Sequence, residues 1–345
     1  MVNLNVIEID GSFGSAGGQI LRTAAALSVI TKKPCHIINI RRGRPKPGLM
    51  SQHLLGIQAL AQLCNGSLEG DELGSEEIKF YPGETKTKNL HLKIETAGSI
   101  TLCLQSLLPA AFFLPEPIKI SFNGGGTDVP FSPTIDHFRY VFLKILEKMG
   151  AKVEIEILKR GYFPVGGGRV MVKVFPSKWK TINLIERGNL KKLLAISRAS
   201  DSLKNKKVAE RQLMGMREIL GKLKLPIEER VEYTQTDCPG SSICLICQFE
   251  NTTLGVDGLG KIGKQSEQVG KETAMMLLEE EKSQACLDRF LADQVLIYMA
   301  LSGGKSQVKV SKITPHVQTN IWVISKFLGE NFKIKDNLII WGPPK

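Results

Sequence analysis

The sequence predicts an α/β (α+β) fold in which repeated βαβαββ units form a large domain that carries a smaller inserted α/β domain. Its 345 residues are enough for about two domains, at roughly 150 residues per domain. An order of strand, glycine-rich loop, helix and strand occurs near the start and recurs about eighty residues later, which is typical of internal repeats. Residues 186–282 do not follow that order, and they predict the insertion.

The first unit opens with residues 6–10 (VIEID), a strand pattern that leads into the glycine-rich loop GSFGSAGG. The Ala- and Leu-rich residues 19–31 predict a helix, which KKP at 32–34 ends before a second strand at 35–40. A second helix and two further strands complete the unit, over 51–64, around 67–71 and around 77–83.

The second unit repeats this order with LKIE, TAGS, ITLCLQSLLPAAFFL, PEP and IKISF between residues 92 and 122. A helix over 132–150 and strands over 151–158 and 167–175 are expected to complete it. A third and fainter echo follows residue 306, with QVKVS, KITPH, VQTNIWVISKFLG and NFKI in the places of strand, loop, helix and strand.

The stretch from 186 to 282 has a different order. It predicts a strand (190–199), a helix (206–223), two strands (229–236 and 241–249), a glycine-rich turn and a closing helix (266–282). Because the third echo comes after this stretch, we expect an inserted small domain at 186–282. The large domain is then discontinuous, over 1–185 plus 283–345.

Composition excludes several classes of protein. A hydrophobic content of 42% with 23% charged residues excludes a disordered chain, a collagen-like chain and a disulfide-stapled miniprotein. Lys and Arg number 46 against 34 Asp and Glu, and the net charge of +12 favours polyanionic partners such as nucleic acid or nucleotides. A contribution to solubility alone is the alternative for this charge.

A cytoplasmic location and no membrane association are expected. The most apolar stretch, 102–115, is too short to span a bilayer and contains Gln105 and Pro109. The opening residues MVNLNVIEIDG lack the basic and apolar segments of a signal peptide. The seven cysteines are odd in number and scattered, which is typical of reduced thiols.

Two segments have the residue types that bind phosphate groups. GSFGSAGGQ at 11–19 lies between a strand and a helix, where backbone N–H groups and a helix N-terminus can approach a phosphate. Arg22, one turn into that helix, is costly to bury unless it meets an anion. IRRGRPKPGLMSQH at 40–53 concentrates four cations on a proline-stiffened turn, and Ser51 is expected to cap the helix that follows. A solvated charged loop is the alternative for the second segment.

Other motifs have weaker or ambiguous meanings. The clusters NGGGTD at 123–128 and FPVGGGRV at 163–170 either face the same site or are simple turns at strand ends. GVDGLGKI at 255–262 has the spacing of a P-loop, but Ile262 replaces the required Ser or Thr, so a turn is expected. Cys244 and Cys247 lie in a predicted strand that points them to opposite faces, which disfavours a zinc site.

His316 has an unusual position among the five histidines. In KITPHVQTN, Thr314 is suited to be a helix N-cap and Pro315 to be the first helical residue, while Gly329 would end the helix. The positive end of the helix dipole disfavours imidazolium, which keeps this histidine neutral and nucleophilic near neutral pH. The β-branched run VQTNIWVI leaves a strand as an alternative, and a histidine without a catalytic role is a second alternative.

Taken together, these segments resemble the RNA 3′-terminal-phosphate cyclase family. The resemblance spans residues 9–320 in the right order and rests on IDGSFGSAGGQILRT, IRRGRPKPGLMSQH, TAGSITLCLQSLLPA, GGGTDVPFSPT, RGYFPVGGG, LADQ and TPHVQTN. It implies three βαβαββ-type repeats with a small domain inserted before the last portion. The enolpyruvyl transferases share the repeat layout but lack the basic segment and the late histidine.

The resemblance implies an ATP-dependent conversion of an RNA 3′-phosphate to a 2′,3′-cyclic phosphodiester. His316 would attack ATP to form a histidyl–AMP intermediate, AMP would pass to the RNA 3′-phosphate, and the 2′-hydroxyl would displace it. A divalent ion, Mg²⁺ or Mn²⁺, is expected with the triphosphate, and Asp293 would orient His316 or hold this metal. The implied ATP and phosphate ligands are Arg22, Arg41, Arg44, Gln52, His53, Gln105, Phe290, Asp293 and Gln294, with Gly14, Gly17 and Gly18 in the loop.

One departure from the family concerns the first glycine-rich loop. The family has GEGGGQ there, whereas this chain has Ser15 followed by Ala16, which removes a carboxylate expected near the metal and the triphosphate. A non-catalytic RNA-binding or ribosome-assembly relative of the same fold is therefore an alternative, but such relatives lack the nucleophilic histidine that this chain retains. A small-molecule transferase is a third reading, and a homodimer is a possible assembly.

Overall fold

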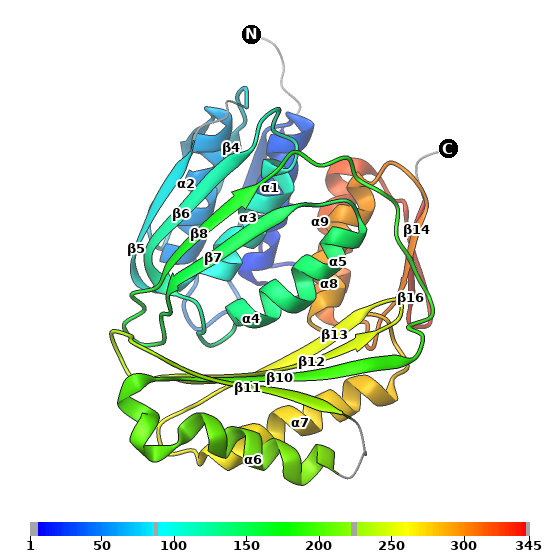
Figure 1. Cartoon of the computed structure of the whole chain (residues 1–345). Helices are drawn as coiled ribbons and strands as arrows, with labels where there is room; N and C mark the ends of the chain where they lie inside the picture. The colour runs from blue at the N-terminus through cyan, green and yellow to red at the C-terminus, as the bar shows by residue number, and fades with distance from the viewer. Residues whose placement is uncertain (1–5, 86–88, 222–225, 343–345) are drawn as a thin grey trace.

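The computed structural model describes residues 6–85, 89–221 and 226–342. Within these residues the strands form four four-stranded sheets. Three sheets lie around the outside of the larger body and enclose a group of packed helices, while the fourth lies beneath them with two helices on its outer face (Figure 1). No helix in the described ranges combines the length and the apolar character needed to cross a bilayer.

The first repeat has the predicted βαβαββ order. Its sheet order is β1-β2-β4-β3, in which β1 and β2 are parallel and the other pairs are antiparallel. The repeat consists of β1 (Ile7–Asp10), α1 (Gly18–Thr31), β2 (Cys35–Ile38), α2 (Ser51–Cys64), β3 (Ser67–Glu69) and β4 (Ile78–Tyr81).

The second repeat has the same topology, with the sheet order β5-β6-β8-β7. Its second helix begins as α4 (Ile135–His137), widens into one π-helical turn, η1 (Phe138–Phe142), and continues as α5 (Leu143–Lys148). The other elements are β5 (Leu90–Ser99), α3 (Ile100–Ala111), β6 (Ile118–Gly126), β7 (Val153–Lys159) and β8 (Arg169–Val174).

The third repeat is complete but is split by the insertion. Its sheet order, β15-β16-β14-β9, matches the other two when β9 is taken as the first strand. The predicted position of QVKVS as the first strand is therefore wrong, because it forms the second strand, β14. The true first strand has only two residues, too few to give a pattern. The elements are β9 (Asn183–Leu184), α8 (Leu291–Leu301), β14 (Ser306–Lys309), α9 (Pro315–Leu328), β15 (Phe332–Lys335) and β16 (Leu338–Trp341).

The remaining sheet, β11-β10-β12-β13, and two helices lie between β9 and α8. The predicted glycine-rich turn at 255–261 is wrong, because most of it belongs to strand β13, and residues 222–223 of the predicted helix lie outside the described residues. The elements are β10 (Leu190–Ser200), the 3₁₀ turn η2 (Asp201–Lys206), α6 (Val208–Leu220), β11 (Ile227–Thr234), β12 (Ser241–Phe249), β13 (Thr253–Leu259) and α7 (Ser266–Lys282). This sheet and its helices support residues 186–282 as the inserted domain, which we propose.

Both faces of the inserted sheet are covered, which explains its nearly continuous apolar strands. On one face, residues such as Leu193 and Cys247 pack with α6 and α7 in a separate small core. On the other, Leu194 and Cys244 belong to the main core of the molecule. Cys244 and Cys247 thus point to opposite faces, and a zinc site that uses both is not formed.

A buried ionic network joins the inserted domain to the second repeat. The two terminal nitrogens of Arg160 each bond a carboxylate, Nη1 that of Asp128 at 2.9 Å and Nη2 that of Asp136 at 2.8 Å. Arg198 on β10 donates to the same Asp136 carboxylate at 2.9 Å and reaches the more exposed Glu232 on its other side. Asp136 is therefore shared by two buried arginines that come from the two domains.

Loss of Asp136 is expected to destabilise the protein. Asp136→Leu removes one carboxylate from each buried arginine and leaves Arg198 with only the more exposed Glu232, so the free energy of unfolding should fall by about 3–5 kcal/mol. Denaturant titration followed by circular dichroism measures this difference. Glu232→Gln is the control, because its carboxylate is largely exposed and should contribute no more than about 1 kcal/mol. Equal effects of the two substitutions would contradict the assignment of Asp136 as the centre of the network.

Candidate active site

The helix that carries His316 begins as the sequence predicts. The Thr314 side chain accepts a hydrogen bond from the Val317 N–H at 3.2 Å, and Pro315 is the first helical residue of α9. Gly329 follows the last helical residue. The strand alternative for this segment is therefore wrong, and His316 lies in the first turn at the helix N-terminus, where it is partly exposed.

The glycine-rich loop is fixed against that first turn. Thr319 on α9 accepts a hydrogen bond from the Ser15 N–H at 3.0 Å and donates to the Pro315 carbonyl at 2.7 Å. Gly14 adopts the left-handed conformation at φ +56°, and a Cβ there would lie 2.4 Å from the Thr319 hydroxyl. Glycine is required at this position on both grounds. The loop and the histidine thus have one common support.

Gln19, in the first turn of α1, holds the His316 residue at two points. Its Nε2 donates to the His316 carbonyl at 2.8 Å, and its Oε1 is hydrogen-bonded to the ring Nδ1. The backbone carbonyl can only accept, so the amide nitrogen must face it and the amide oxygen must face Nδ1. Because that oxygen also can only accept, Nδ1 carries the ring proton and Nε2 is left with its lone pair.

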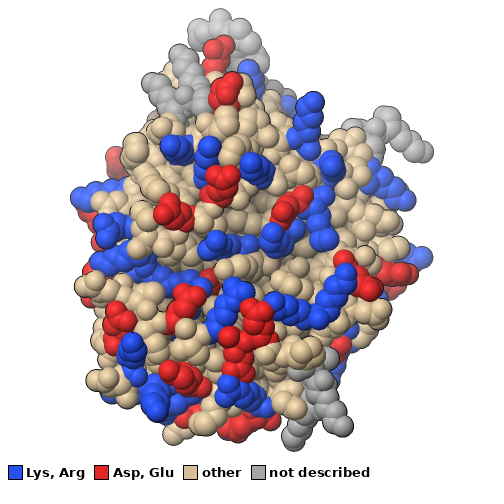
Figure 2. Space-filling view, viewed as in Figure 1, with Lys and Arg blue, Asp and Glu red and all other residues tan. Residues whose placement is uncertain are grey.

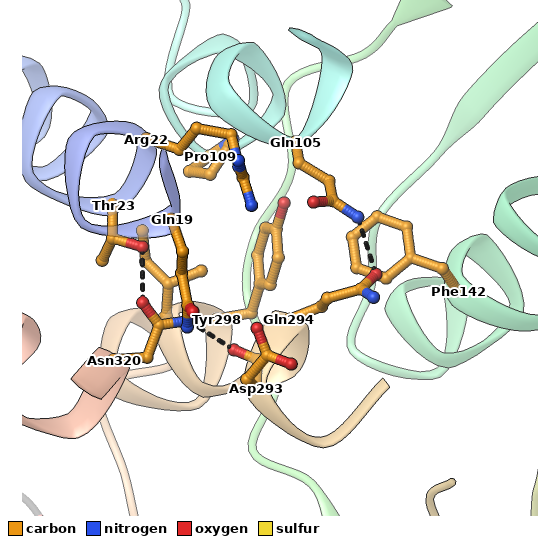
Figure 3. A pocket seen from close by; sticks show the side chains of 11 residues that line it. Gln19, Arg22, Thr23, Gln105, Pro109, Phe142, Asp293, Gln294, Tyr298 and Asn320 are labelled. Carbon is orange, nitrogen blue, oxygen red and sulfur yellow. Dashed lines mark hydrogen bonds between the residues drawn. The ribbon is translucent and has the colours of Figure 1, made fainter. Parts of the chain in front are cut away.

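Polar contacts one turn further along keep the three helices of the site in register. The Thr23 hydroxyl on α1 donates to the Asn320 side-chain oxygen at 2.7 Å. The Asn320 amide donates in turn to the Asp293 carbonyl of α8 at 2.8 Å (Figure 3). Since Thr23 and Asn320 lie four residues after Gln19 and His316, the two pairs lie on the same faces of α1 and α9.

Arg22 extends into the pocket that these helices form with α3, with Asp293 on the opposite side (Figure 3). Burial lowers the pKa of Arg22 to about 10, which the negative charge of Asp293 partly opposes. Burial raises the pKa of Asp293 to about 7, although Arg22 opposes this shift. Arg22 has no hydrogen-bond or ion-pair partner among the described residues, so it is available to bind an anion.

The basic turn after β2 folds over the glycine-rich loop. Arg44 Nη2 donates to the Ser15 carbonyl at 2.6 Å, and its Nε donates to the Ala16 carbonyl at 3.3 Å. Arg41 is attached to its own turn through the Gly48 carbonyl at 3.1 Å. A Cβ added to Gly17 would lie 3.5 Å from Arg44 and 3.6 Å from His316. Arg44 and the catalytic candidate therefore both lie beside Gly17.

His53 and Gln52 place the start of α2 beside the same loop. The His53 Nδ1 accepts a hydrogen bond from the Met50 N–H at 3.4 Å. A Cβ on Gly18 would lie only 2.0 Å from the His53 Nε2, so the ring packs directly against that glycine. Gln52 accepts from the Ser99 N–H at 3.2 Å, which leaves its amide N–H groups free. The expected Ser51 cap is wrong, because the ring of His53 takes that place. The Ser51 hydroxyl instead lies 3.4 Å from that of Thr96.

The opposite wall of the pocket is a chain of amides. Gln105 on α3 donates to the Gln294 oxygen at 2.8 Å, and Gln294 donates to the Phe290 carbonyl at 2.7 Å. The Phe290 ring itself is 46% exposed at the start of α8 and does not line the pocket. Its ring is therefore accessible from solvent at the edge of the site.

The site concentrates positive charge around a histidine. Partial burial, followed by the charges of Arg22 and Arg44, lowers the pKa of His316 below its usual value. Burial, Arg22 and Arg41 lower the pKa of His53 to about 3. Both histidines are neutral at pH 7. In the described part of the chain, Arg22, Arg41, Arg44 and Lys46 have no carboxylate within 4.0 Å, so an anionic ligand would supply the missing charge.

A protein-built metal centre does not fit these residues. Within the ranges that the structure describes, no three His, Cys, Asp or Glu side chains are grouped closely enough to hold a metal ion. Asp293 is the one carboxylate among the residues that line the pocket. Its raised pKa further disfavours it as an anionic ligand in the absence of a cation.

The structure brings most of the predicted site residues together, and it adds one. One region receives residues from the glycine-rich loop, the basic turn, the start of α2, and the helices α3, α8 and α9. Phe290 lies at the edge of this region. Gln19 was not singled out by sequence reasoning, although it stands in the glycine-rich segment. The sequence pattern there predicts only that Gln19 lies in the first turn of a helix. Its contact with His316 joins residues 297 positions apart, so no local pattern indicates it.

Comparisons with known proteins agree on one family. The family model described as RNA 3′-terminal phosphate cyclase matches residues 13–334. A protein named RNA 3′-terminal phosphate cyclase from Pyrococcus furiosus is 46% identical, over 96% of this chain and 95% of its own length. Proteins of the same name from Thermococcus kodakarensis and Saccharolobus islandicus are 45% and 42% identical, over 95% and 94% of this chain and 94% of each relative.

Loss of the Gln19 amide is expected to release the His316 ring from its single tautomer. In ¹⁵N NMR spectra near neutral pH, the wild-type ring should show a protonated Nδ1 and an unprotonated Nε2. In Gln19→Leu it should populate both tautomers, because nothing then accepts from Nδ1. Gln105→Leu is the control, since this amide lies in the pocket but contacts Gln294 and not the ring. An unchanged tautomer in Gln19→Leu would contradict the assignment.

Proposed function

This chain belongs to the RNA 3′-terminal phosphate cyclase family, and from that premise we propose that it converts an RNA 3′-terminal phosphate to a 2′,3′-cyclic phosphodiester at the expense of ATP. The observation that carries the proposal is the position of His316, whose Nδ1 is hydrogen-bonded to Gln19 and whose pKa is lowered by partial burial and by Arg22 and Arg44. Neither a plain RNA-binding surface nor a structural histidine needs that combination.

We propose that His316 is the nucleophile. Its Nε2 attacks the α-phosphorus of ATP, the bond to the bridging oxygen breaks, and pyrophosphate leaves. Nδ1 keeps its proton, which is hydrogen-bonded to Gln19 Oε1. The product is therefore a positively charged imidazole ring joined to AMP. That ring can later depart as neutral imidazole without any further proton transfer, which makes it a good leaving group. Gln19 acts here as a positioning residue.

The arginines hold the anionic groups. Arg22 inside the pocket and Arg41 and Arg44 at its rim would bind the phosphates of ATP and of the RNA end, together with N–H groups of Gln52 and His53. The N–H groups at the start of α1, at Gly17 and Gly18, would add to this binding, because the N-terminus of a helix favours anions. Gln105, Gln294 and Phe290 would contact the nucleoside, with the exposed Phe290 ring available to stack on adenine.

The second half of the reaction follows from the same intermediate. An oxygen of the RNA 3′-phosphate attacks the phosphorus of the histidyl adenylate, the N–P bond breaks, and His316 is regenerated. The RNA then ends in a mixed anhydride with AMP. The neighbouring 2′-hydroxyl attacks the RNA phosphorus, loses its proton to solvent, and AMP leaves as the ring closes.

The divalent ion that the family implies is not assigned to protein ligands. The pocket has one carboxylate, so we propose that Mg²⁺ or Mn²⁺ is bound mainly by the phosphate oxygens of ATP. Ser15 stands where the resembled family has glutamate, and its buried hydroxyl has no hydrogen-bond partner among the described residues.

A non-catalytic RNA-binding role is the second candidate, and the absence of a carboxylate at Ser15 is the observation that favours it. The retained His316, Gln19 and arginines favour the enzyme. We also propose a reducing compartment, the cytoplasm, because the seven cysteines are free thiols and six of them are buried.

Covalent adenylylation tests the proposed nucleophile. Wild-type protein incubated with α-labelled ATP should retain label that is acid-labile and alkali-stable, and His316→Ala should retain none. His91→Ala is the matched control, because His91 is an exposed histidine on β5 that hydrogen-bonds Ser121. Absence of label in the wild type, together with salt-sensitive binding of 3′-phosphorylated RNA, would favour the non-catalytic candidate.

The pH dependence of adenylylation should reflect the lowered pKa of His316. The ring must be neutral to attack, so the rate should fall on the acid side only below the ordinary histidine pKa of about 6.5. Arg44→Gln removes one cause of the lowering, and the acid limb should move upward in pH. Arg42→Gln, which changes a neighbouring exposed arginine, should leave the limb in place. A downward shift in Arg44→Gln would contradict the electrostatic cause.

A further inference from the structure

Two glycine-rich loops of the second repeat have no role in the reaction proposed above. The first, residues 123–134, begins in the last residues of β6, and the second, residues 160–168, follows β7. We call them the paired loops. The Thr127 N–H donates to the Gly161 carbonyl at 2.9 Å, and the Gly168 N–H donates to the Gly125 carbonyl at 2.8 Å. The sequence left open whether they face one site, and these bonds show that they form one structure.

The base of the paired loops is rigid. Arg160 is buried and bonds Asp128 of the first loop and Asp136 of the helix that follows it. Tyr162 is also buried, and a Cβ on Gly240 of the inserted domain would lie 2.1 Å from its ring. The loops are thus anchored on both domains, so their tips do not need to order when a ligand binds.

The tips of the paired loops present apolar side chains to solvent. Phe131 is fully exposed and Phe163 is 62% exposed, with Val165 beside it. Phe131 also has a left-handed backbone, at φ +64°, which a bulky residue adopts only when its surroundings impose it. Exposed aromatic rings on a rigid, strained support are typical of a binding surface and not of a core.

The paired loops adjoin the proposed phosphate site. A Cβ on Gly125 would lie 2.9 Å from the Gly98 carbonyl, and the next N–H, that of Ser99, bonds Gln52. On the other loop, a Cβ on Gly166 would lie 2.9 Å from the Thr96 carbonyl, and the Thr96 side chain contacts Ser51 at the start of α2. The basic turn, residues 41–46, leads into this same helix.

We propose that the paired loops bind the bases of the RNA that precede its terminal phosphate, with Phe131 and Phe163 as stacking platforms. The surface continues from the site where that phosphate would be bound, and the exposed cations of the basic turn, Arg42 and Lys46, complement a nucleic-acid backbone. Basic side chains also form a band across the middle of the face shown in Figure 2, with acidic ones interspersed. This inference rests on the proposed function, because it takes the 3′-phosphorylated end as the anchored group.

Binding of a fluorescein-labelled, 3′-phosphorylated RNA of about ten nucleotides tests the surface by anisotropy. Phe131→Ala and Phe163→Ala should each raise the Kd about tenfold, the effect expected for loss of one stacked base. Phe163→Trp should keep the Kd of the wild type, since the larger ring also stacks. Met214→Ala is the control, because it truncates a side chain that is 47% exposed on α6. Both alanine variants alter exposed side chains, and unfolding curves would verify that they fold.

The readouts separate this inference from the proposed function. An RNA with abasic sites next to its 3′-end should bind wild type as weakly as normal RNA binds the Phe variants, because only the bases stack. Equal Kd values for all proteins, or no binding by wild type, would overturn the proposal. A change in self-association by light scattering with an unchanged Kd would also overturn it and assign the loops to a second copy of the chain. If wild type forms no histidine adenylate but its RNA binding needs the two rings, the proposed function fails and this inference stands.

Discussion

Positive charge without a counter-charge is the constraint on which the site depends. Arg22 and Arg44 lie close enough to His316 to lower its pKa, and Arg41 acts in the same way on the neighbouring His53. Among the described residues that line the pocket, Asp293 is the one carboxylate, and burial raises its pKa to about 7. Such an arrangement is costly in the free protein, because like charges repel and buried guanidinium groups lose hydration. The cost is offset only when a polyphosphate enters. The same charges lower the pKa of the imidazole, so in the proposed reaction one electrostatic arrangement both binds the substrate and prepares the nucleophile.

Holding such a site open requires supports that are themselves uncharged. Amide and hydroxyl side chains provide this support. Gln19 bonds the His316 residue, Thr319 bonds the glycine-rich loop, and Asn320 links α1 to α8. Neutral hydrogen bonds fix geometry without adding charge that would compete with a phosphate for the arginines. The charged network of Asp128, Asp136 and Arg160 lies instead at the junction with the inserted domain, where it joins two bodies and faces no ligand.

The sequence alone predicts the first two repeats and most site residues, because long periodic segments and glycine-rich turns leave clear patterns. It misses features that have no local pattern. Strand β9 has two residues and pairs with a strand more than a hundred positions later, so the third repeat was placed one strand too late. GVDGLG is a strand because Gly255 and Gly258 allow η1 and α7 to approach it, which is a tertiary requirement. The role of Gln19 likewise depends on a contact with a residue 297 positions away, which no local pattern indicates.

The distribution of the site along the chain has a consequence for biosynthesis. The proposed phosphate-binding arginines lie within about the first 60 residues, whereas the proposed nucleophile, His316, lies more than 250 residues later. A ribosome therefore synthesises residues 1–314 before α9 can form and dock on α1, and the split third repeat cannot close until the insertion has been made. Prematurely terminated chains would have anion-binding loops but no reactive imidazole. Incomplete products could sequester nucleotides, but they could not become charged with AMP.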